Sequence, residues 1–469
     1  MNPIFGQLPL LMNNTSSAQK WLLTATSISY IIVILDTSIV NVALAPLAAT
    51  LHSTITGLQW VVSSYTVTFA SLLLSGGALG DKLGAKNVYL TGLLLFALAS
   101  AGCGFSSTLS SMIFSRILQG IGAALLVPAS LALINSEFPQ SQERAKAIGI
   151  WAGCGGIAMA AGPLFGGLLI QLLGWRSIFL VNVPIALIGI VLATRIPVIK
   201  ISASEKPMDF AGQLLAIIML GSSIAVLIEG VHRGWRDPWI YGGVLVATVA
   251  WGLFIFTERT INHPMLPMKL FRLADFTASV TVSLISGLVF YGLFFLLSLY
   301  FETVRGWSSL DAGLAYLPLT LLVTLGSFSA GKLNRLFGPL WLIAGCCGLY
   351  AAGFAGLMIL RENTPYWQIA LCFPALGLAA GVITPVATAA VMGSIVKEQA
   401  GIAAGVLNAS RQTGSALGVA IFGGLLSAVK PLAAGIYVAV CLGIAFSMLG
   451  GLLWIIILSR NSTHEKNTP

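Results

Sequence analysis

Long apolar runs separated by short polar segments make up almost the whole chain. Most runs have about 20 residues or more, the length that a helix needs to cross ~30 Å of hydrocarbon. The pattern therefore predicts an all-α integral membrane protein with about fourteen transmembrane helices. The runs lie near residues 21 to 47, 57 to 79, 88 to 107, 110 to 134, 146 to 171, 177 to 194, 210 to 228, 239 to 257, 276 to 301, 312 to 331, 339 to 360, 366 to 392, 401 to 427 and 431 to 458.

The composition supports the same class. Hydrophobic residues make up 57% of the chain and charged residues 8%, whereas soluble domains have roughly a quarter charged residues. The lipid bilayer is therefore the expected surroundings of this protein.

Lys and Arg are distributed unevenly among the predicted loops. One set falls at the two termini and in the even-numbered loops: Lys20, Lys82, Lys86, Arg144, Lys146, Arg195, Lys200, Lys206, Arg259, Lys269, Arg272, Lys332, Arg335, Lys397, Arg460 and Lys466. The odd-numbered loops contain only Arg176, Arg233, Arg236, Arg305, Arg361 and Lys430. The positive-inside rule then places both termini in the cytoplasm. Because the basic residues are spread over many loops, the net charge of +9 reflects topology, and no nucleic-acid partner is expected.

The chain also repeats itself. Gly77 to Gly84 resembles Gly331 to Gly338 at an offset of 254 residues, and Phe165 to Leu169 matches Phe422 to Leu426 at an offset of 257. Such a period in a membrane protein indicates two related bundles with a binding site between them.

The repeat sets the expected domain organisation. Residues 1–206 form one six-helix bundle and residues 259–469 form a second, pseudo-symmetric bundle. Two additional transmembrane helices are inserted between them, in residues 207–258.

Asp36 stands out among the fifteen acidic residues because only it lies deep inside a long apolar run. A charged group at that depth costs a few kcal/mol and usually faces a bundle interior, where it handles protons, ions or substrate. Arg116 lies in the fourth run at a depth that differs by only ~6 Å, given ~1.5 Å rise per residue. We expect the two side chains to face each other or to share a water chain. Burial favours the neutral acid and the guanidinium favours the charged one, so the pair can serve as a switchable proton site. The alternative is a static ion pair that fixes helix packing.

Other titratable residues suggest little chemistry. The sequence predicts no second buried acid, which argues against a site specialised for dications. The cysteines lie within apolar runs without Cys-x-x-Cys spacing and the histidines are isolated, so neither a metal site nor a cofactor is expected. His232 and Asp237 have the spacing of an acyltransferase motif, but an interfacial turn anchored by Trp235 explains the same residues.

Three segments resemble signature motifs of the major facilitator superfamily. Gly77 to Lys86 resembles its cytoplasmic loop between spans two and three, with Ala85 at a commonly basic position. Arg116 to Gly122 is similar to the fourth-span motif of proton-coupled members. Gly162 to Gly167 resembles the fifth-span antiporter motif, although Ala158 stands where a glycine often precedes it.

Three further segments narrow the resemblance. Leu35 to Leu44 resembles the first-span signature of the fourteen-helix drug:proton antiporters. Tyr65 to Leu72 and Val406 to Gln412 are most similar to the methylenomycin A resistance proteins.

The resemblance implies proton-coupled efflux of small amphiphilic drugs or toxic compounds by alternating access, with the proton gradient as the only energy source. It also implies a monomer in the bacterial inner membrane, and a protein that is not an enzyme. Two alternatives remain open: an exporter of a specific metabolite, antibiotic or lipid, and an integral-membrane acyltransferase that uses His232 and Asp237.

The candidate site residues fall into four groups. Asp36 and Arg116 are expected to couple protons. The expected conformational latch, in which charged residues close the cytoplasmic side, consists of Gly77, Asp81, Lys82, Gly84 and Lys86. Tight helix packing is expected at the antiporter-motif residues Gly162, Pro163, Gly166 and Gly167. A substrate cavity is expected among Asn41, Trp60, Tyr65, Gln119, Tyr291, Phe294 and Arg411.

Overall fold

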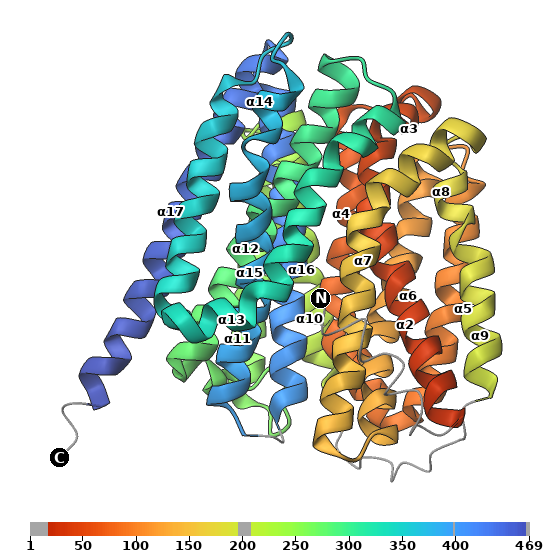
Figure 1. Ribbon diagram of the computed structural model, residues 1–469, viewed down its shortest axis with the longest axis vertical. Coiled ribbons are helices and arrows are strands. Elements are labelled where there is room, and N and C mark those ends of the chain that lie inside the picture. The colour runs from red at the N-terminus through yellow and green to blue at the C-terminus, as the bar shows by residue number, and fades with distance from the viewer. Residues whose placement is uncertain (1–16, 196–207, 397–398, 466–469) are drawn as a thin grey trace.

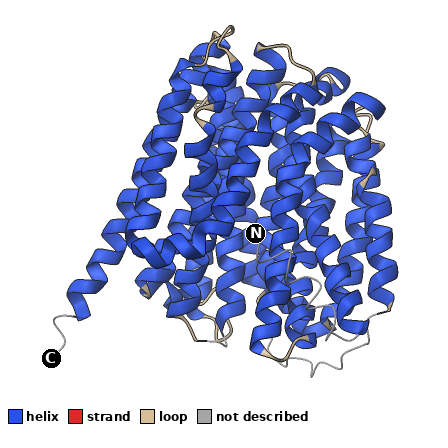
Figure 2. Cartoon of the chain, viewed as in Figure 1, coloured by secondary structure: helices blue, strands red, loops and turns tan. Residues whose placement is uncertain are grey.

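Helices account for nearly all of the structure. The computed structural model describes residues 17–195, 208–396 and 399–465. Within these ranges there is no strand, and the loops are short and lie at the two ends of the helices (Figure 2). Twelve helices in this part of the chain are long and apolar enough to cross a membrane. The protein is therefore a multi-pass membrane protein.

Two sequence predictions concern residues outside these ranges. The predicted boundary between residues 206 and 207 lies outside the described residues. The same holds for Lys200, Lys206, Lys397 and Lys466, four of the basic residues on which the predicted topology depends.

The first half of the chain forms the helices to the right in Figure 1. They are α2 (Ser17–Ile39), the 3-10 turn η1 (Val40–Ala43), α3 (Leu44–Leu51), α4 (Ile55–Leu83), α5 (Ala85–Gly104), α6 (Leu109–Glu137), α7 (Ser141–Leu173), α8 (Ser177–Leu180) and α9 (Asn182–Thr194). Then follow α10 (Phe210–Arg233) and α11 (Pro238–Thr260).

The second half contains the remaining elements. They are the 3-10 turn η2 (Met268–Arg272), α12 (Ala274–Leu299), the π-helical turn η3 (Tyr300–Val304), α13 (Ser309–Gly356), the 3-10 turn η4 (Leu357–Ile359), α14 (Tyr366–Ala370), α15 (Phe373–Ser394), α16 (Ala400–Ala428) and α17 (Leu432–Glu465). Gly338 interrupts α13 with a left-handed backbone (φ +71°), so two helices meet there.

Local sequence explains where several helices begin. Thr108 and Ser111 form a capping box at the start of α6, in which each side chain bonds the other residue's backbone N–H. The hydroxyl of Ser308 accepts the N–H of Asp311 at the start of α13. Gly84 ends α4 with φ +89°, a conformation that favours glycine, and α5 follows at once.

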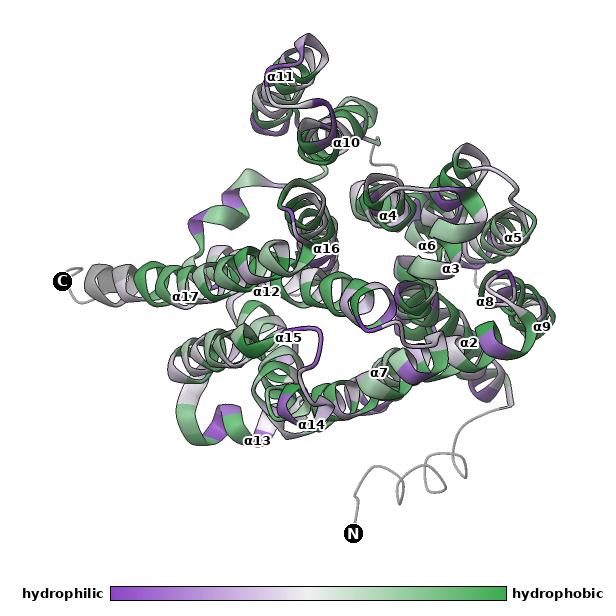
Figure 3. Cartoon of the chain, turned by 90° about the horizontal axis from the view of Figure 1, so that it is seen from above, coloured by the Kyte–Doolittle hydropathy of each residue, from purple (hydrophilic) through white to green (hydrophobic). Residues whose placement is uncertain are grey.

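Viewed from above, the helices form two groups (Figure 3). The first contains α2 to α9 and the second contains α12 to α17. Outside both groups, α10 lies next to α4 and α16, and α11 packs on the far side of α10. The amide of Gln213 on α10 donates to the Ser71 carbonyl on α4 at 3.0 Å. Of the two inserted helices, α10 therefore makes a polar contact with the first group.

Backbones of the two halves approach closely along α7 and α13. A Cβ on Gly313 of α13 would lie 2.3 Å from the Pro163 carbonyl oxygen of α7. A Cβ on Gly167 of α7 would lie 2.5 Å from the Ser309 carbonyl oxygen of α13. Because small residues on both helices allow this approach, any larger side chain must push the halves apart.

Hydrogen bonds also join the halves toward the end of the molecule that contains α3, α8 and α14 (Figure 1). Gln59 of α4 donates to the carbonyls of Val419 and Ala420 on α16 at 3.1 and 2.8 Å. Ser298 of α12 donates to the Asn41 carbonyl. We call this set of contacts, together with that of Glu302 described below, the α3-end seam.

Candidate functional site

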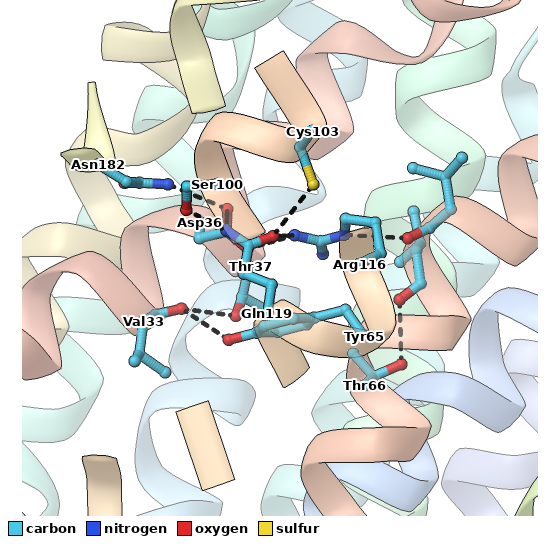
Figure 4. A network of polar contacts seen from close by, with 12 residues as sticks. Val33, Asp36, Thr37, Tyr65, Thr66, Ser100, Cys103, Arg116, Gln119 and Asn182 are labelled. Atoms are coloured by element: carbon cyan, nitrogen blue, oxygen red, sulfur yellow. Dashed lines mark hydrogen bonds and ion pairs between the residues drawn. The ribbon is translucent and has the colours of Figure 1, made fainter. Parts of the chain in front are cut away.

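Asp36 lies in the last turn of α2 and is fully buried inside the first half. Three side chains surround its carboxylate, namely Arg116, Gln119 and Asn182, and we call these four residues the Asp36 cage (Figure 4). They come from α2, α6 and α9, so the cage fixes three helices relative to one another.

Arg116 is held on all sides. Its Nη1 donates to Asp36 Oδ2 at 2.5 Å and to Gln119 Oε1 at 2.6 Å, and its Nε donates to the Val61 carbonyl at 3.1 Å. The guanidinium carbon lies 4.2 Å from the centre of the Tyr65 ring, a cation–π contact. The structure therefore brings Asp36 and Arg116 together, as their similar depth predicted.

Gln119 and Asn182 complete the coordination of Asp36 Oδ1. Gln119 donates to it at 2.8 Å and Asn182 at 3.2 Å. The same amide nitrogen of Gln119 also donates to the Ser100 hydroxyl at 2.8 Å. Sequence reasoning missed Asn182 and Ser100 as members of this site. Their only signal was a polar residue within an apolar run, which many packing residues share.

The cage gives Asp36 an unusual environment. Arg116, Gln119 and Asn182 all donate hydrogen bonds to the carboxylate, and Arg116 carries a positive charge. The charged form of Asp36 is therefore well solvated by protein groups although the residue is fully buried. Such a group can store a negative charge inside a membrane and exchange it for a proton when its partners move.

The residues predicted to line one substrate cavity lie in different places. Tyr65 and Gln119 belong to the surroundings of Asp36, and Asn41 is buried at the α3-end seam. Phe294 is buried and stacks on Tyr316 with ring centres 4.7 Å apart.

Trp60 points away from this group. Its indole N–H donates to Glu229 of α10 at 2.9 Å. It lines a cavity of about 340 Å³ between α4, α6 and α10 with mostly apolar walls.

Arg411 and Tyr291 lie on the second half and are partly buried. Arg411 donates to Asn408 Oδ1 at 2.7 Å, while its Nε is buried without a partner. The Tyr291 ring packs edge-on against Phe290, with ring centres 5.5 Å apart.

In the first half, Tyr30 of α2 stacks on Trp151 of α7 with ring centres 3.7 Å apart. The buried indole nitrogen of Trp151 has no hydrogen-bond partner. Two buried donors on opposite halves thus lack an acceptor.

Four of the five predicted latch residues lie at the junction of α4 and α5, whereas Gly77 lies inside α4. Asp81 and Lys82 are exposed in the last turn of α4, and Gly84 forms the turn itself. Lys86 donates to the Thr194 carbonyl at the end of α9 at 3.3 Å. This loop therefore contacts the last helix of its own half.

The antiporter-motif residues are buried on two faces of α7. Gly162 and Gly166 face α2, where added Cβ atoms would lie 1.9 Å from the Ser38 hydroxyl and 2.6 Å from the Ile39 side chain. Pro163 and Gly167 face α13 in the other half. One short segment thus joins the helix of Asp36 to the second bundle.

The prediction that no second acid is buried was wrong. Glu302 of η3 is 7% exposed, and Glu258 near the end of α11 is 2% exposed. Glu302 Oε2 accepts the N–H of Ala45 in the first half at 2.9 Å, and its Oε1 accepts the Ser309 hydroxyl at 3.2 Å. The ninth apolar run ends at Phe301, but the π-helical turn continues to Val304 and the α3-end seam covers the carboxylate.

The remaining candidates have structural surroundings. Asp237 caps α11 by accepting the Trp239 N–H at 2.8 Å, as expected for a turn. No group of three or more His, Cys, Asp or Glu side chains suited to a metal occurs among the described residues.

The membrane helices form two halves with a buried ion pair in one of them, an arrangement typical of membrane transporters. The family model of the Major Facilitator Superfamily matches residues 26–419. The chain therefore belongs to that superfamily.

Known proteins agree with this assignment. The chain is 35% identical to the methylenomycin A resistance protein of Bacillus subtilis over 97% of both chains. It is 30% identical to the tetracenomycin C resistance and export protein of Streptomyces glaucescens over 86% of this chain and 75% of that protein.

A solved structure shares the fold. It is a bacterial homologue of the human lysosomal transporter Spinster, described as inward-facing and unoccupied, with a TM-score of 0.67 and 16% identity. The match covers 95% of this chain and 98% of that one.

Proposed function

We propose that this protein exports small amphiphilic drugs or toxic compounds in exchange for protons, by alternating access. The observation that carries this proposal is the Asp36 cage, a fully buried carboxylate bonded to Arg116 at 2.5 Å inside one half of a two-half transporter. The named relatives support an efflux substrate, since they confer resistance to antibiotics and one is named as an export protein.

The proposed arrangement has fourteen membrane crossings, both termini in the cytoplasm and the α3 end outside. Twelve helices meet the length and hydropathy requirement. The break at Gly338 divides α13 into two crossings, which adds one to this number, and α16 with 29 residues adds the fourteenth. In this proposal the protein acts as a monomer in the bacterial cytoplasmic membrane, with α10 and α11 beside the two bundles.

Proton binding would change the conformation because the proton and Arg116 compete for the Asp36 carboxylate. While Asp36 is charged, Arg116 and Gln119 hold it at 2.5 and 2.8 Å. A proton removes the negative charge and weakens both bonds, which releases α6 from α2. Because α7 packs on α2 through Gly162 and on α13 through Gly167, a shift of α2 reaches the second half through one helix. No cofactor is needed, since the proton gradient supplies the energy.

Substrate recognition would use buried hydrogen-bond donors of the protein, which would bond acceptor atoms of the transported compound. Arg411 Nε and Trp151 Nε1 are buried without a partner, on opposite halves, and the stacked Tyr30–Trp151 pair offers an aromatic surface. Buried polar groups normally find partners, so these two donors suit an amphiphile that carries a carbonyl or carboxylate group.

Gating would use the contacts between the halves. The α3-end seam closes the outer side through Asn41, Ala45 and Gln59. The α4–α5 loop with Asp81, Lys82 and Lys86 would serve as the latch on the inner side when the seam opens.

The decisive experiment measures transport into everted vesicles with an imposed pH gradient. The parent protein should accumulate a substrate dye or drug when the vesicle interior is acidic, and Asp36→Asn should abolish the gradient-driven part. Equal gradient-driven uptake by the parent and by Asp36→Asn would contradict proton coupling at this residue. Alanine at both His232 and Asp237 should leave transport unchanged.

A further inference from the structure

The Asp36 cage contains one buried polar atom without a partner. Asn182 is fully buried, and its Nδ2 donates to Asp36 Oδ1 at 3.2 Å. Its Oδ1 has no hydrogen-bond partner. Burying a carbonyl oxygen without a hydrogen-bond partner destabilises the folded protein by roughly 1–3 kcal/mol. An unpaired oxygen directly beside the proposed proton site therefore needs a physical reason.

Protonation of Asp36 changes what the carboxyl group needs. The charged group only accepts hydrogen bonds, whereas the neutral acid has an O–H that must donate one. Arg116, Gln119 and Asn182 all approach Asp36 with donors. As the cage stands, a protonated Asp36 would have no acceptor among these three partners.

Gln119 cannot supply the acceptor. Its Oε1 accepts Arg116 Nη1 at 2.6 Å and the Cys103 thiol at 3.7 Å. Exchanging its amide oxygen and nitrogen would point an NH2 group at the guanidinium, two donors facing each other. The charge of Arg116 therefore locks Gln119 in one orientation.

Asn182 has no such restraint. Its side chain bonds Asp36 through Nδ2, and the oxygen and nitrogen of its amide have nearly the same shape. We propose that the Asn182 amide turns over when Asp36 takes up a proton, so that Oδ1 accepts the new O–H. Asn182 is then a positioning residue that solvates both protonation states of Asp36, and the proposal rests on Asp36 being the coupling residue.

The other titratable and charged groups around Asp36 do not accept a hydrogen bond from its protonated carboxyl group. Arg116 of α6 can only donate. The Tyr65 hydroxyl of α4 bonds the Val33 carbonyl at 3.4 Å and the Cys103 thiol of α5 bonds Gln119, and neither is hydrogen-bonded to the Asp36 carboxyl group. On α9, which contributes Asn182, no titratable side chain contacts the carboxylate among the described residues.

The test compares pH profiles of gradient-driven transport in everted vesicles. Asn182→Leu keeps the size of the side chain but removes its acceptor, so the neutral acid loses more than the charged one, which retains Arg116 and Gln119. We expect about tenfold weaker proton binding, a shift of the profile by about one pH unit toward acid. Asn182→Thr, whose hydroxyl can donate or accept, should return the midpoint most of the way.

Infrared difference spectroscopy on the purified full-length protein provides a readout that a structural role would not move. Acidification should produce a carboxylic carbonyl band that Asp36→Asn removes. In Asn182→Leu this band should move to higher frequency, since the acid has lost its acceptor, and in Asn182→Thr it should stay near the parent position. The matched control is Thr26→Val on α2, whose hydroxyl bonds only within its own helix and which should change neither midpoint nor band.

The outcomes separate this inference from the proposed function. If Asp36→Asn still transports along the gradient like the parent, the proposed coupling fails. If Asp36→Asn is uncoupled but Asn182→Leu matches the parent in both profile and carbonyl band, only the role of Asn182 is overturned.

Discussion

The two halves of this transporter share a repeated framework but have different cores. The first half buries the Asp36–Arg116 ion pair with two amides around it. At the repeat offset of 254 to 257 residues, Arg116 corresponds to Ala370 to Phe373 in the second half. There the core is aromatic, with Phe373 fully buried and Phe294 stacked on Tyr316 at 4.7 Å.

This difference separates the tasks of the halves. A buried ion pair contributes little net stability but responds strongly to a proton, whereas a packed aromatic cluster is rigid and insensitive to pH. We infer that the first half senses the proton gradient while the second half serves as a stiff body against which the first half moves. Mutations in the first core should therefore change the response to protons, and mutations in the second core should change stability alone.

The largest effect is expected from Arg116→Leu, which leaves Asp36 buried without its counter-charge. Removing one partner of a buried pair costs about 3–5 kcal/mol, so the protein should unfold at a markedly lower temperature and lose gradient-driven transport. Thermal unfolding in detergent and vesicle uptake measure the two losses.

The double variant Arg116→Leu with Asp36→Asn shows whether the loss of stability comes from the unpaired charge of Asp36. It removes the uncompensated charge, so it should recover most of the thermal stability while transport stays uncoupled. A double variant as unstable as Arg116→Leu alone would show that Arg116 acts through packing on Tyr65 and not through Asp36.

In the second half, Phe294→Ala should cost about 3 kcal/mol because it leaves a cavity beside Tyr316. The remaining folded protein should keep the pH midpoint of the parent, because no titratable partner of Asp36 lies in this cluster. Phe294→Leu is the matched control with a smaller loss of stability. A shifted pH midpoint in Phe294→Ala would contradict the division of tasks between the halves.

Sequence reasoning reached the Asp36–Arg116 contact because it depends on helix geometry alone. A constant rise per residue gives the depth of each side chain, and two opposite charges at similar depth in one bundle have few other partners. It did not reach Asn182, whose contact with Asp36 joins residues 146 positions apart. Only the packing of α9 against α2 creates that contact, and one sequence contains no signal for it.

The same limit explains the other differences. Trp60 was expected to line a substrate cavity, but helical periodicity does not determine which helix packs on a given face. The face of α4 that contains Trp60 meets α10, where Glu229 accepts the indole N–H. Glu302 lies one residue past the end of its apolar run, so its burial depends on the contact between halves. Helices and their repeat were predictable from local pattern, whereas burial at a seam is a property of the assembled fold.

A smaller effect is expected where the halves touch. In Gly167→Val the new side chain would strike the Ser309 and Leu310 backbone of α13, and overpacking of this kind costs about 1–3 kcal/mol. We expect about tenfold slower transport with an unchanged pH midpoint. Gly153→Val on the same helix is the matched control, since nothing lies within 4 Å of its added Cβ. Equal rates for the two variants would show that α7 and α13 do not need this close approach.

The smallest expected effect concerns Glu302, the second buried carboxylate, which differs from Asp36 in bonding across the halves to the Ala45 N–H at 2.9 Å. Glu302→Gln keeps an acceptor but loses the charge, which weakens this bond by about 1 kcal/mol and favours opening of the α3-end seam roughly fivefold. Leu44→Cys, fully buried in the closed seam, reports the opening through its rate of labelling by a membrane-impermeant maleimide. The parent for this comparison carries Leu44→Cys alone, with the native cysteines replaced. Glu302→Gln should speed the labelling, whereas Asp36→Asn in the same background should alter its dependence on pH. If Glu302→Gln removed the pH dependence and Asp36→Asn left it intact, the proton would act at the seam between the halves and not in the core of the first.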